Sequence, residues 1–524
     1  MPKPSTKGAP TPKAPTSQPF TLTPEQELAV AAAADPTTPS IMLNAYAGTA
    51  KTTTLRLMAH AQLRPSSALA LAFNKKVSTD LAAALPLWYE VRSFNALGHR
   101  AWGAKIGHLT LDERKLGRIT TQFFRASGKE WPEDAWDSVR QLVSEAMNAG
   151  LKPSSFPGPA GLLPDTWESW VDLADNAFIP PDPDYISLAR EILDYHISEG
   201  LSGLISYDDQ IYLPTLFGGL FPRVSQVIVD EYQDLNPLNI LMLRKVAGGR
   251  IWCAGDRLQS IYRFRGADDQ AQSKIRALKP DWLDLSLTLT FRCPRAVVDR
   301  QQSHAIGFTA APANPEGQVT LLRPPLDSGP WSWSWSQIPE GEVTVLCRAN
   351  APLLKLALKL LRQGIGIKMM KRDLGKSLLA LSKKLFPVDS TPIPQCLTQV
   401  DTWREKETQA ISARGHGDKI GVIDDRAECL LAILESPEVT CAGDFRKRLE
   451  FLFSQTHALV TLSTIHGFKG LECPTILHLD HWRTPSRKAL AAGGPELQQE
   501  LNLKYVAETR TQSHLILASL EDFT

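Results

Sequence analysis

A short apolar strand, a loop of small residues, a Lys-Thr pair and a helix follow one another over residues 41–58. The loop consists of Asn-Ala-Tyr-Ala-Gly-Thr-Ala and is followed directly by Lys51 and Thr52. In such a turn, backbone N–H groups at the helix N-terminus can surround a phosphate, the lysine neutralises charge and the threonine hydroxyl can ligate Mg²⁺. The strict pattern G-x-x-x-x-G-K-[ST] fails at Ala45 and Ala50, so the segment alone fits a phosphate loop and an ordinary strand–turn–helix equally well.

The bulk composition excludes several classes of protein. With 524 residues the chain is too long for one core and predicts about three or four domains. Its 57 Lys plus Arg against 56 Asp plus Glu give no overall basic field, although a neutral protein can still carry a basic groove. The seven cysteines form no Cys-x-x-Cys pair, so we expect reduced, structural thiols and no metal centre built from cysteines. No apolar run approaches the ~18–20 residues that span a bilayer, so we expect no membrane segment.

Strand-like and helical stretches alternate along the chain. Thr23, Pro24 and Gln26 form a capping-box pattern that predicts a helix over residues 25–34. Short apolar runs alternating with helices favour parallel α/β sheets, the second of which we expect to begin near Leu283. The predicted divisions are a proline-rich disordered tail at 1–19, a first α/β domain at 20–102 and 205–275, a helical insertion at 103–204, a second α/β domain at 276–373 and 454–524, and a short helical insertion at 374–453.

The strongest local signal is Val-Ile-Val-Asp-Glu-Tyr-Gln-Asp at residues 227–234. A buried strand that ends in Asp230 and Glu231 places two carboxylates at the sheet edge where α/β proteins bind ligands. In a phosphate-loop ATPase the first acid holds Mg²⁺ and the second orients and deprotonates the attacking water. The alternative is a strand-end acidic turn, which the phosphate-loop-like segment upstream makes less favoured.

Eight segments stand in a fixed order from residue 20 to the C-terminus. They are Gln26, residues 47–52 (AGTAKT), 73–75 (FNK), 230–234 (DEYQD), 255–268 (GDRLQSIYRFRGAD), 290–294 (TFRCP), 463–472 (STIHGFKGLE) and 505–510 (YVAETR). Together they resemble the motifs of superfamily 1 DNA helicases of the UvrD/Rep type. The resemblance covers nearly the whole ordered chain.

The resemblance implies an ATP site with assigned roles. Gln26 reads adenine, Phe291 stacks on the base, and Glu472 contacts the ribose. Thr52 and Asp230 hold Mg²⁺. The implied catalytic residues are Glu231, the γ-phosphate sensor Gln259, the phosphate-binding Lys51, and the paired arginine fingers Arg292 and Arg510. The full ATP-binding set is Gln26, Ala47, Gly48, Thr49, Ala50, Lys51, Thr52, Thr53, Phe291, Arg292, Glu472 and Arg510.

Physical chemistry supports the arginine assignment. A guanidinium stays cationic and presents a planar fork to the charge that develops on the γ-phosphate oxygens. When the arginines come from a second domain, hydrolysis depends on closure of the two domains.

The DNA-binding residues are also implied by the resemblance. The interleaved aromatics and arginines of residues 262–265 have the composition of a stacking platform for single-stranded bases. The alternative is that Tyr262 and Phe264 pack in the core. The family commonly has Trp at the position of Phe264 and His at that of Asn95. The predicted DNA-binding set is Phe73, Asn74, Ser93, Asn95, Tyr262, Phe264, Arg265, Thr464 and His466.

Ala50 is the departure that bears on activity. The family has Gly before the lysine, because glycine lets the backbone approach phosphate without a Cβ and adopts φ values that alanine disfavours. We expect the methyl group to be tolerated if φ at Ala50 is negative. We therefore expect an active enzyme whose nucleotide affinity depends on this position.

The sequence thus predicts an α/β protein with two RecA-like parallel-sheet motor domains of the P-loop NTPase class, each with a mainly helical insertion. The resemblance implies an ATP- and Mg²⁺-dependent DNA helicase or translocase that moves 3′→5′ on single-stranded DNA and acts at single–double-strand junctions. It implies a cytoplasmic location, in a bacterial nucleoid or a phage-infected cell. Two alternatives stay open: a translocase that strips proteins or recombination filaments without unwinding, and a DNA-binding scaffold with an impaired ATP site.

Overall fold

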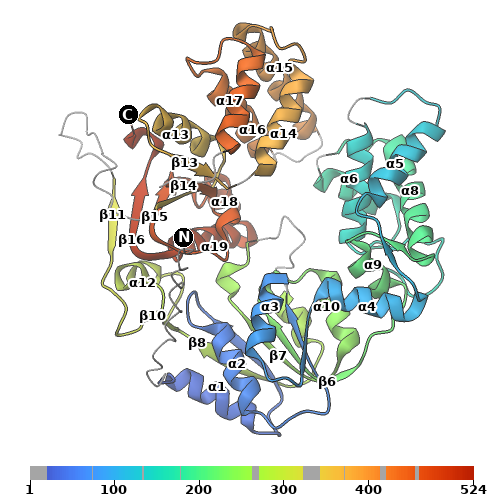
Figure 1. Ribbon diagram of the computed structural model, residues 1–524, viewed down its shortest axis with the longest axis vertical. Helices are drawn as coiled ribbons and strands as arrows, with labels where there is room; N and C mark the ends of the chain where they lie inside the picture. Colours follow the sequence, from blue (N-terminus) through green and yellow to red (C-terminus); the bar gives the residue numbers. More distant parts are fainter. Residues whose placement is uncertain are drawn as a thin grey trace, which may run out of the picture.

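The computed structural model describes residues 21–72, 75–132, 135–177, 179–261, 271–322, 343–370, 372–413, 420–454 and 460–523. It shows a mixed α/β protein built on two six-stranded sheets of parallel strands (Figure 1). The predicted tail at 1–19 and the Trp-rich run at 331–335 lie outside the described residues. Within the described residues, no helix is long and apolar enough to cross a membrane.

The first sheet has the strand order β3-β2-β6-β7-β1-β8. Its strands are β1 (Ser40–Ala45), β2 (Ala68–Ala72), β3 (Tyr89–Ser93), β6 (Val224–Asp230), β7 (Ala247–Gly255) and β8 (Trp282–Leu287). Short buried apolar runs form these strands because both faces are covered by helices. One face packs against α1 (Pro24–Ala34), α2 (Lys51–Ala61) and α3 (Lys75–Ala84), and the other against α4 (Phe94–Ile106), α10 (Pro237–Val246) and α11 (Ala271–Arg276).

The N-terminal helix confirms the capping box. The Thr23 side chain accepts from the Gln26 backbone N–H, the Gln26 side chain accepts from the Thr23 N–H, and α1 begins at Pro24. The residue pattern therefore fixed the start of α1 locally.

The position of β8 corrects our expectation. We expected the strand near Leu283 to open the second α/β unit, but β8 pairs with β1 in the first sheet, with Leu283 opposite Ile41 and Leu285 opposite Leu43. An apolar run predicts a strand, but its residues do not specify which sheet receives it. The crossing to the second sheet comes after β8, through β9 (Leu289–Thr290) and its partner β10 (Thr309–Ala310).

The second sheet has the order β11-β16-β15-β12-β14-β13. Its strands are β11 (Gln318–Leu321), β12 (Val343–Cys347), β13 (Ile367–Met369), β14 (Val460–Thr464), β15 (Cys473–Leu479) and β16 (Thr511–Ala518). One face packs against α13 (Ala351–Arg362), and the other against α12 (Arg295–Gln301) and α19 (Gly494–Glu508). The short helix α18 (Arg487–Ala492) precedes α19.

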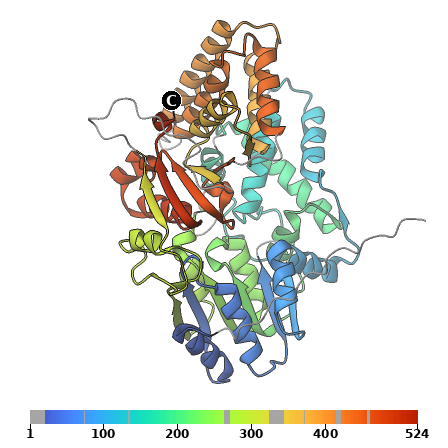
Figure 2. The same ribbon diagram turned by 60° about the vertical axis from the view of Figure 1, so that its left-hand side comes forward.

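Two groups of helices lie beside the sheets (Figures 1 and 2). The first contains α5 (Lys115–Ala126), α6 (Ala135–Asn148), α7 (Trp167–Asn176), α8 (Pro183–Leu201), α9 (Asp209–Leu216) and the small ladder of β4 (Thr110–Leu111) with β5 (Leu204–Ile205). These helices share a core of their own. The second group contains α14 (Arg372–Leu385), α15 (Ile393–Ala413), α16 (Ile420–Leu434) and α17 (Ala442–Ser454), and its core is continuous with that of the second sheet. Our remaining domain boundaries stay predictions.

Candidate functional site

The loop between β1 and α2 lies against the segment that follows β9. The Phe291 N–H donates to the Gly48 carbonyl at 2.9 Å. Gly48 has φ +71°, and a Cβ there would lie 2.6 Å from both Arg292 Cβ and Thr290 Oγ1. Glycine is therefore required at position 48 for both its backbone conformation and its close contacts.

Ala50 contradicts the condition that we set for it. Its φ is +58° and its ψ +38°, in the left-handed region rather than at negative φ. This conformation is unfavourable for an L-residue with a Cβ. The backbone at position 50 therefore adopts a glycine-like turn despite the methyl group.

Four side chains meet at the ends of β1 and β6. Lys51 Nζ lies 2.9 Å from Glu231 Oε1, and Thr52 Oγ1 donates to Asp230 Oδ2 at 2.7 Å. Glu231 follows β6 in the left-handed conformation with φ +56°. The two segments that the sequence singled out separately thus come together through β1 and β6, which lie on either side of β7.

Burial and neighbouring charges shift the pKa values of this cluster. Burial, reinforced by the Glu231 charge, raises the pKa of Asp230 to about 6. Burial acts in the same direction on Glu231, but Lys51 and the Gln233 hydrogen bond outweigh it and lower that pKa to about 2. Burial opposes the charged form of Lys51, yet the carboxylates of Glu231 and Asp230 together raise its pKa. Lys51 and Glu231 therefore form a charged pair.

The donor set beside Lys51 suits Mg²⁺ bound together with phosphate. The Thr52 hydroxyl and the Asp230 carboxylate are hard oxygen ligands 2.7 Å apart. Within the described ranges, no group of three or more His, Cys, Asp or Glu side chains could hold a metal by itself. Mg²⁺ commonly uses one or two protein oxygens and takes its other ligands from phosphate and water.

A chain of hydrogen bonds runs from the loop to the second sheet. The Tyr505 hydroxyl accepts from the Ala47 N–H at 2.8 Å and donates to Asp256 Oδ2 at 3.3 Å. Gln259 Nε2 donates to the same Asp256 oxygen at 2.7 Å, and Gln259 Oε1 accepts from Arg510 at 2.7 Å. Burial raises the pKa of Asp256 to about 6, although Lys51 and Gln259 oppose this shift.

The two arginines carry buried nitrogen atoms without protein partners. Arg292 Nη1 lies 3.4 Å from Glu472 Oε2, but its Nε and Nη2, and Nε of Arg510, have no hydrogen-bond partner among the described residues. Burial, reinforced by the neighbouring Arg292, lowers the pKa of Arg510 to about 10. Unpaired buried N–H donors are costly, so this arrangement is suited to an anionic ligand.

Other predicted ATP residues occupy varied positions. Gln26 is 1% exposed, and its side chain donates to Thr54 Oγ1 at 3.2 Å besides capping α1. Thr49 donates to the Tyr46 carbonyl, and Thr53 lies half-buried in the first turn of α2. Phe291 keeps 39% of its surface exposed. The structure thus places Gln26 inside the α1–α2 packing, whereas Phe291 stays partly exposed.

Of the predicted DNA-binding residues, four lie within the described ranges. Ser93 ends β3 and caps α4, and Asn95 Nδ2 donates to the Tyr207 carbonyl at 3.1 Å. Thr464 ends β14 and accepts from the Gly467 N–H, and His466 begins the turn η6 (His466–Phe468). These four lie at carboxyl ends of strands in the two sheets. Phe73, Asn74, Tyr262, Phe264 and Arg265 lie outside the described residues.

Sequence reasoning gave no role to several residues that join the site. Lys469 Nζ contacts Asp234 Oδ1 at 2.6 Å and the Gln259 carbonyl at 2.7 Å, so it connects the second sheet to the first. Asp256 and Tyr505 act in the chain of hydrogen bonds described above. All three belong to segments quoted for the resemblance, but only the tertiary structure shows what they contact.

Comparisons with known proteins find similarity to DNA helicases. Residues 210–278 match the model of the UvrD/REP helicase N-terminal domain. The chain is 23% identical to F-box DNA helicase protein 1 of Schizosaccharomyces pombe over 95% of this chain and 57% of that protein. It is 25% identical to ATP-dependent DNA helicase UvrD2 of Mycobacterium tuberculosis over 56% of this chain and 47% of that protein. It is 23% identical to DNA helicase II of Escherichia coli over 44% of this chain and 33% of that protein. The chain therefore spans no more than 57% of the length of these relatives.

Proposed function

Because this chain belongs to the UvrD-like superfamily 1 helicases, we propose that it is a DNA-dependent ATPase that moves along single-stranded DNA and unwinds duplexes. The observation that carries the proposal is the set of cations around the loop at residues 47–52. Lys51 lies in the loop, and buried N–H groups of Arg292 and Arg510 approach from the second sheet without protein partners among the described residues. A triphosphate supplies the anionic acceptors that these donors lack.

The proposed roles are those that the family resemblance implies, and the contacts of these residues support them. Thr52 and Asp230 would hold Mg²⁺, which would supply positive charge to neutralise the phosphates. Lys51 binds phosphate and gives up its contact with Glu231, which then orients and deprotonates the attacking water. Arg292 and Arg510 stabilise the charge that develops on the γ-phosphate, and Gln259, which already contacts Arg510, senses that phosphate.

Contacts between the two sheets at Gln259 could couple the state of the bound ATP to the relative position of the sheets. Arg510 and Lys469 from the second sheet contact Gln259 of the first, so a change at the γ-phosphate alters contacts between the sheets. Ser93, Asn95, Thr464 and His466 at strand ends of both sheets are the proposed contacts for the single strand. We propose 3′→5′ movement on the strength of the family resemblance.

The test uses the purified 524-residue chain under four conditions: without DNA, with single-stranded DNA, with a 3′-tailed duplex and with a 5′-tailed duplex. We expect hydrolysis to be stimulated manyfold by single-stranded DNA and the 3′-tailed duplex to be unwound. Lys51→Ala and Glu231→Gln should abolish hydrolysis. Arg292→Ala should spare nucleotide binding, measured with a fluorescent ATP analogue, while stopping turnover.

Each alternative predicts a different result. Stimulated hydrolysis with movement along DNA but no unwinding of either duplex would favour the translocase that strips proteins from DNA. DNA binding without stimulated hydrolysis at saturating ATP would favour the scaffold with an impaired ATP site. Unwinding of only the 5′-tailed duplex would refute the proposed polarity.

A further inference from the structure

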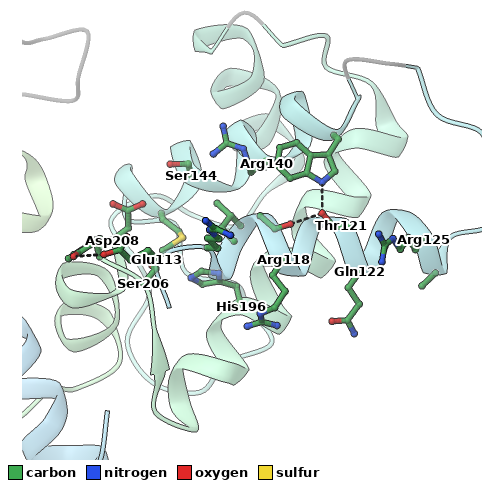
Figure 3. A pocket seen from close by; sticks show the side chains of 17 residues that line it. Glu113, Arg118, Thr121, Gln122, Arg125, Arg140, Ser144, His196, Ser206 and Asp208 are labelled. Carbon is green, nitrogen blue, oxygen red and sulfur yellow. Dashed lines mark hydrogen bonds between the residues drawn. The ribbon is translucent and has the colours of Figure 1, made fainter. Parts of the chain in front are cut away.

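A cavity of about 1280 Å³ lies among the helices beside the first sheet, away from the loop at residues 47–52 (Figure 3). It is lined by α5, α6 and the segment before α9. Leu116, Trp136 and Met147 give it an apolar lining. The lining thus offers apolar and aromatic surface to a ligand.

Four arginines also line this cavity: Arg114, Arg118 and Arg125 at α5, and Arg140 on α6. Arg114, Arg118 and Arg125 are spaced by four and seven residues, so they lie along one face of the helix over roughly 16 Å. Figure 3 shows Arg118 and Arg125 projecting from one helix and Arg140 from its neighbour. The row of cations matches an extended chain of anionic groups better than a single small anion.

The ion pairs leave part of this charge uncompensated. Arg118 contacts Asp112 and Glu199, and Arg140 lies 3.9 Å from Asp137. Arg114 and Arg125 have no acidic partner among the described residues. The acidic residues lining the cavity are Glu113, which accepts from the Tyr207 hydroxyl at 2.9 Å, and Asp208. Arginine therefore outnumbers acid in the lining by four to two.

A buried polar atom in the lining also lacks a partner. His196 has no measurable exposure, and its Nε2 lies 2.9 Å from Asp209 Oδ1. Asp209 in turn accepts from Lys115 at 2.7 Å, so the ring is held in place. His196 Nδ1 has no hydrogen-bond partner among the described residues, and the residue lines the cavity. Because this nitrogen is itself buried, it belongs to the polar network behind the lining and not to the surface that a ligand would touch.

The cavity adjoins the DNA-binding edge of the first sheet. Tyr207 lines the cavity, is 51% exposed, and accepts through its backbone carbonyl from Asn95 Nδ2 at 3.1 Å. Asn95 stands just after β3 among the residues proposed to contact the single strand. A strand that leaves this edge reaches the cavity through Tyr207.

We propose that this cavity binds a stretch of single-stranded DNA that continues from the edge of the first sheet. The arginines contact phosphates, and Trp136 with its apolar neighbours contacts bases. Single-stranded DNA exposes apolar base faces, whereas a duplex buries them in its stack, so the mixed apolar and cationic lining fits a single strand. This inference rests on the proposed function, because it extends the path of the same DNA strand. An acidic peptide would match part of this lining, but the continuity with Asn95 favours DNA.

The experiment compares the wild-type chain, Arg114→Ala/Arg125→Ala and a control, Arg56→Ala/Arg64→Ala. All four arginines are exposed and have no acidic partner among the described residues, so melting curves should agree. Binding of labelled oligothymidylate is followed by fluorescence anisotropy at several salt concentrations. A plot of log affinity against log salt has a negative slope, and each lost phosphate contact should reduce its magnitude by about 0.7. Removing Arg114 and Arg125 should therefore make the slope shallower by about 1.4. We also expect Kd to rise about tenfold at low salt, while the control keeps wild-type values.

Wild-type affinity and salt slope in Arg114→Ala/Arg125→Ala would overturn the inference, as would an equal loss in the control. Loss of binding to a labelled acidic peptide with unchanged DNA binding would likewise overturn it in favour of a peptide site. The result is separable from the proposed function. If the wild-type chain shows no DNA-stimulated hydrolysis, the motor is refuted, yet anisotropy still reports whether these arginines bind the strand.

Discussion

At the scale of single residues, strained backbone gathers where the chemistry is proposed. Among the described residues, the non-glycine residues with positive φ are Ala50, Glu231 and Asp480, and the first two flank the Lys51 amine. An L-residue in this conformation costs roughly 1–2 kcal/mol. The surrounding contacts must hold these backbones in place, as is common at functional sites.

Ala50→Gly should therefore stabilise the protein, in contrast to most alanine-to-glycine changes. We expect the free energy of unfolding to rise by about 1 kcal/mol, because glycine adopts φ +58° without the Cβ penalty. Urea unfolding measures this change, and nucleotide titration shows whether affinity rises with it. Ala59→Gly, within α2, is the matched control and should lower stability by about 1 kcal/mol or more. A loss of stability in Ala50→Gly would mean that the left-handed turn is not the native conformation.

The raised pKa of Asp256 predicts that the free energy of unfolding depends on pH. Burial raises its pKa to about 6 from 3.8, so between these values the folded state keeps a proton that the unfolded state has lost. Stability conferred by this group therefore falls as pH rises from about 4 to 6. Asp256→Asn removes the effect, so its stability relative to wild type should rise by up to about 3 kcal/mol over this window. Denaturant unfolding at pH 4 and pH 7 measures the change, and a constant difference would contradict the assigned burial effect.

At the scale of elements, α19 connects the loop after β1 to the second sheet. Tyr505 contacts the Ala47 N–H and Asp256, and Asn502 donates to the carbonyls of Arg257 and Ser260. The helix thus contacts both the loop and the turn η2 (Arg257–Gln259). A shift of α19 is therefore expected to alter the loop at residues 47–52 and the turn that contains Gln259 together.

Tyr505→Phe should cost about 1–3 kcal/mol of stability, because it leaves the buried Ala47 N–H unpaired. We also expect a higher KM for ATP, since that N–H belongs to the loop at residues 47–52, where we propose that ATP binds. Tyr212→Phe is the control, because it removes an equally buried hydroxyl that donates to the Leu151 carbonyl in the helical group. Equal effects of both variants on KM would show that Tyr505 acts only through general stability.

At the scale of the whole molecule, the two sheets are joined by polar contacts. Lys469 and Asp234 form an ion pair whose side chains are each 8% exposed, and Arg510 contacts Gln259 nearby. Buried ion pairs contribute little net stability, but removing one partner leaves an uncompensated charge. The contact is therefore suited to holding one arrangement of the sheets while allowing another.

Lys469→Met should loosen the contact between the sheets, because the buried Asp234 loses its cation. We expect an increased radius of gyration by small-angle X-ray scattering, and partial recovery in Lys469→Met/Asp234→Asn, which removes both charges. Lys447→Met, at a lysine 82% exposed, is the control and should leave the radius unchanged. An unchanged radius in Lys469→Met would mean that other contacts fix the arrangement.

The sequence by itself determined the local elements and the types of residue at the site. The capping box set the start of α1, buried apolar runs marked the strands of both sheets, and the strand-end Asp230 and Glu231 pointed to the same edge as Lys51. Only the tertiary structure decided that β8 joins the first sheet and that Ala50 is left-handed. It also decided that Tyr505 and Asp256 link the loop to the second sheet. Caps and periodicity act over a few residues, whereas strand pairing, forced φ values and buried networks depend on contacts between segments hundreds of positions apart.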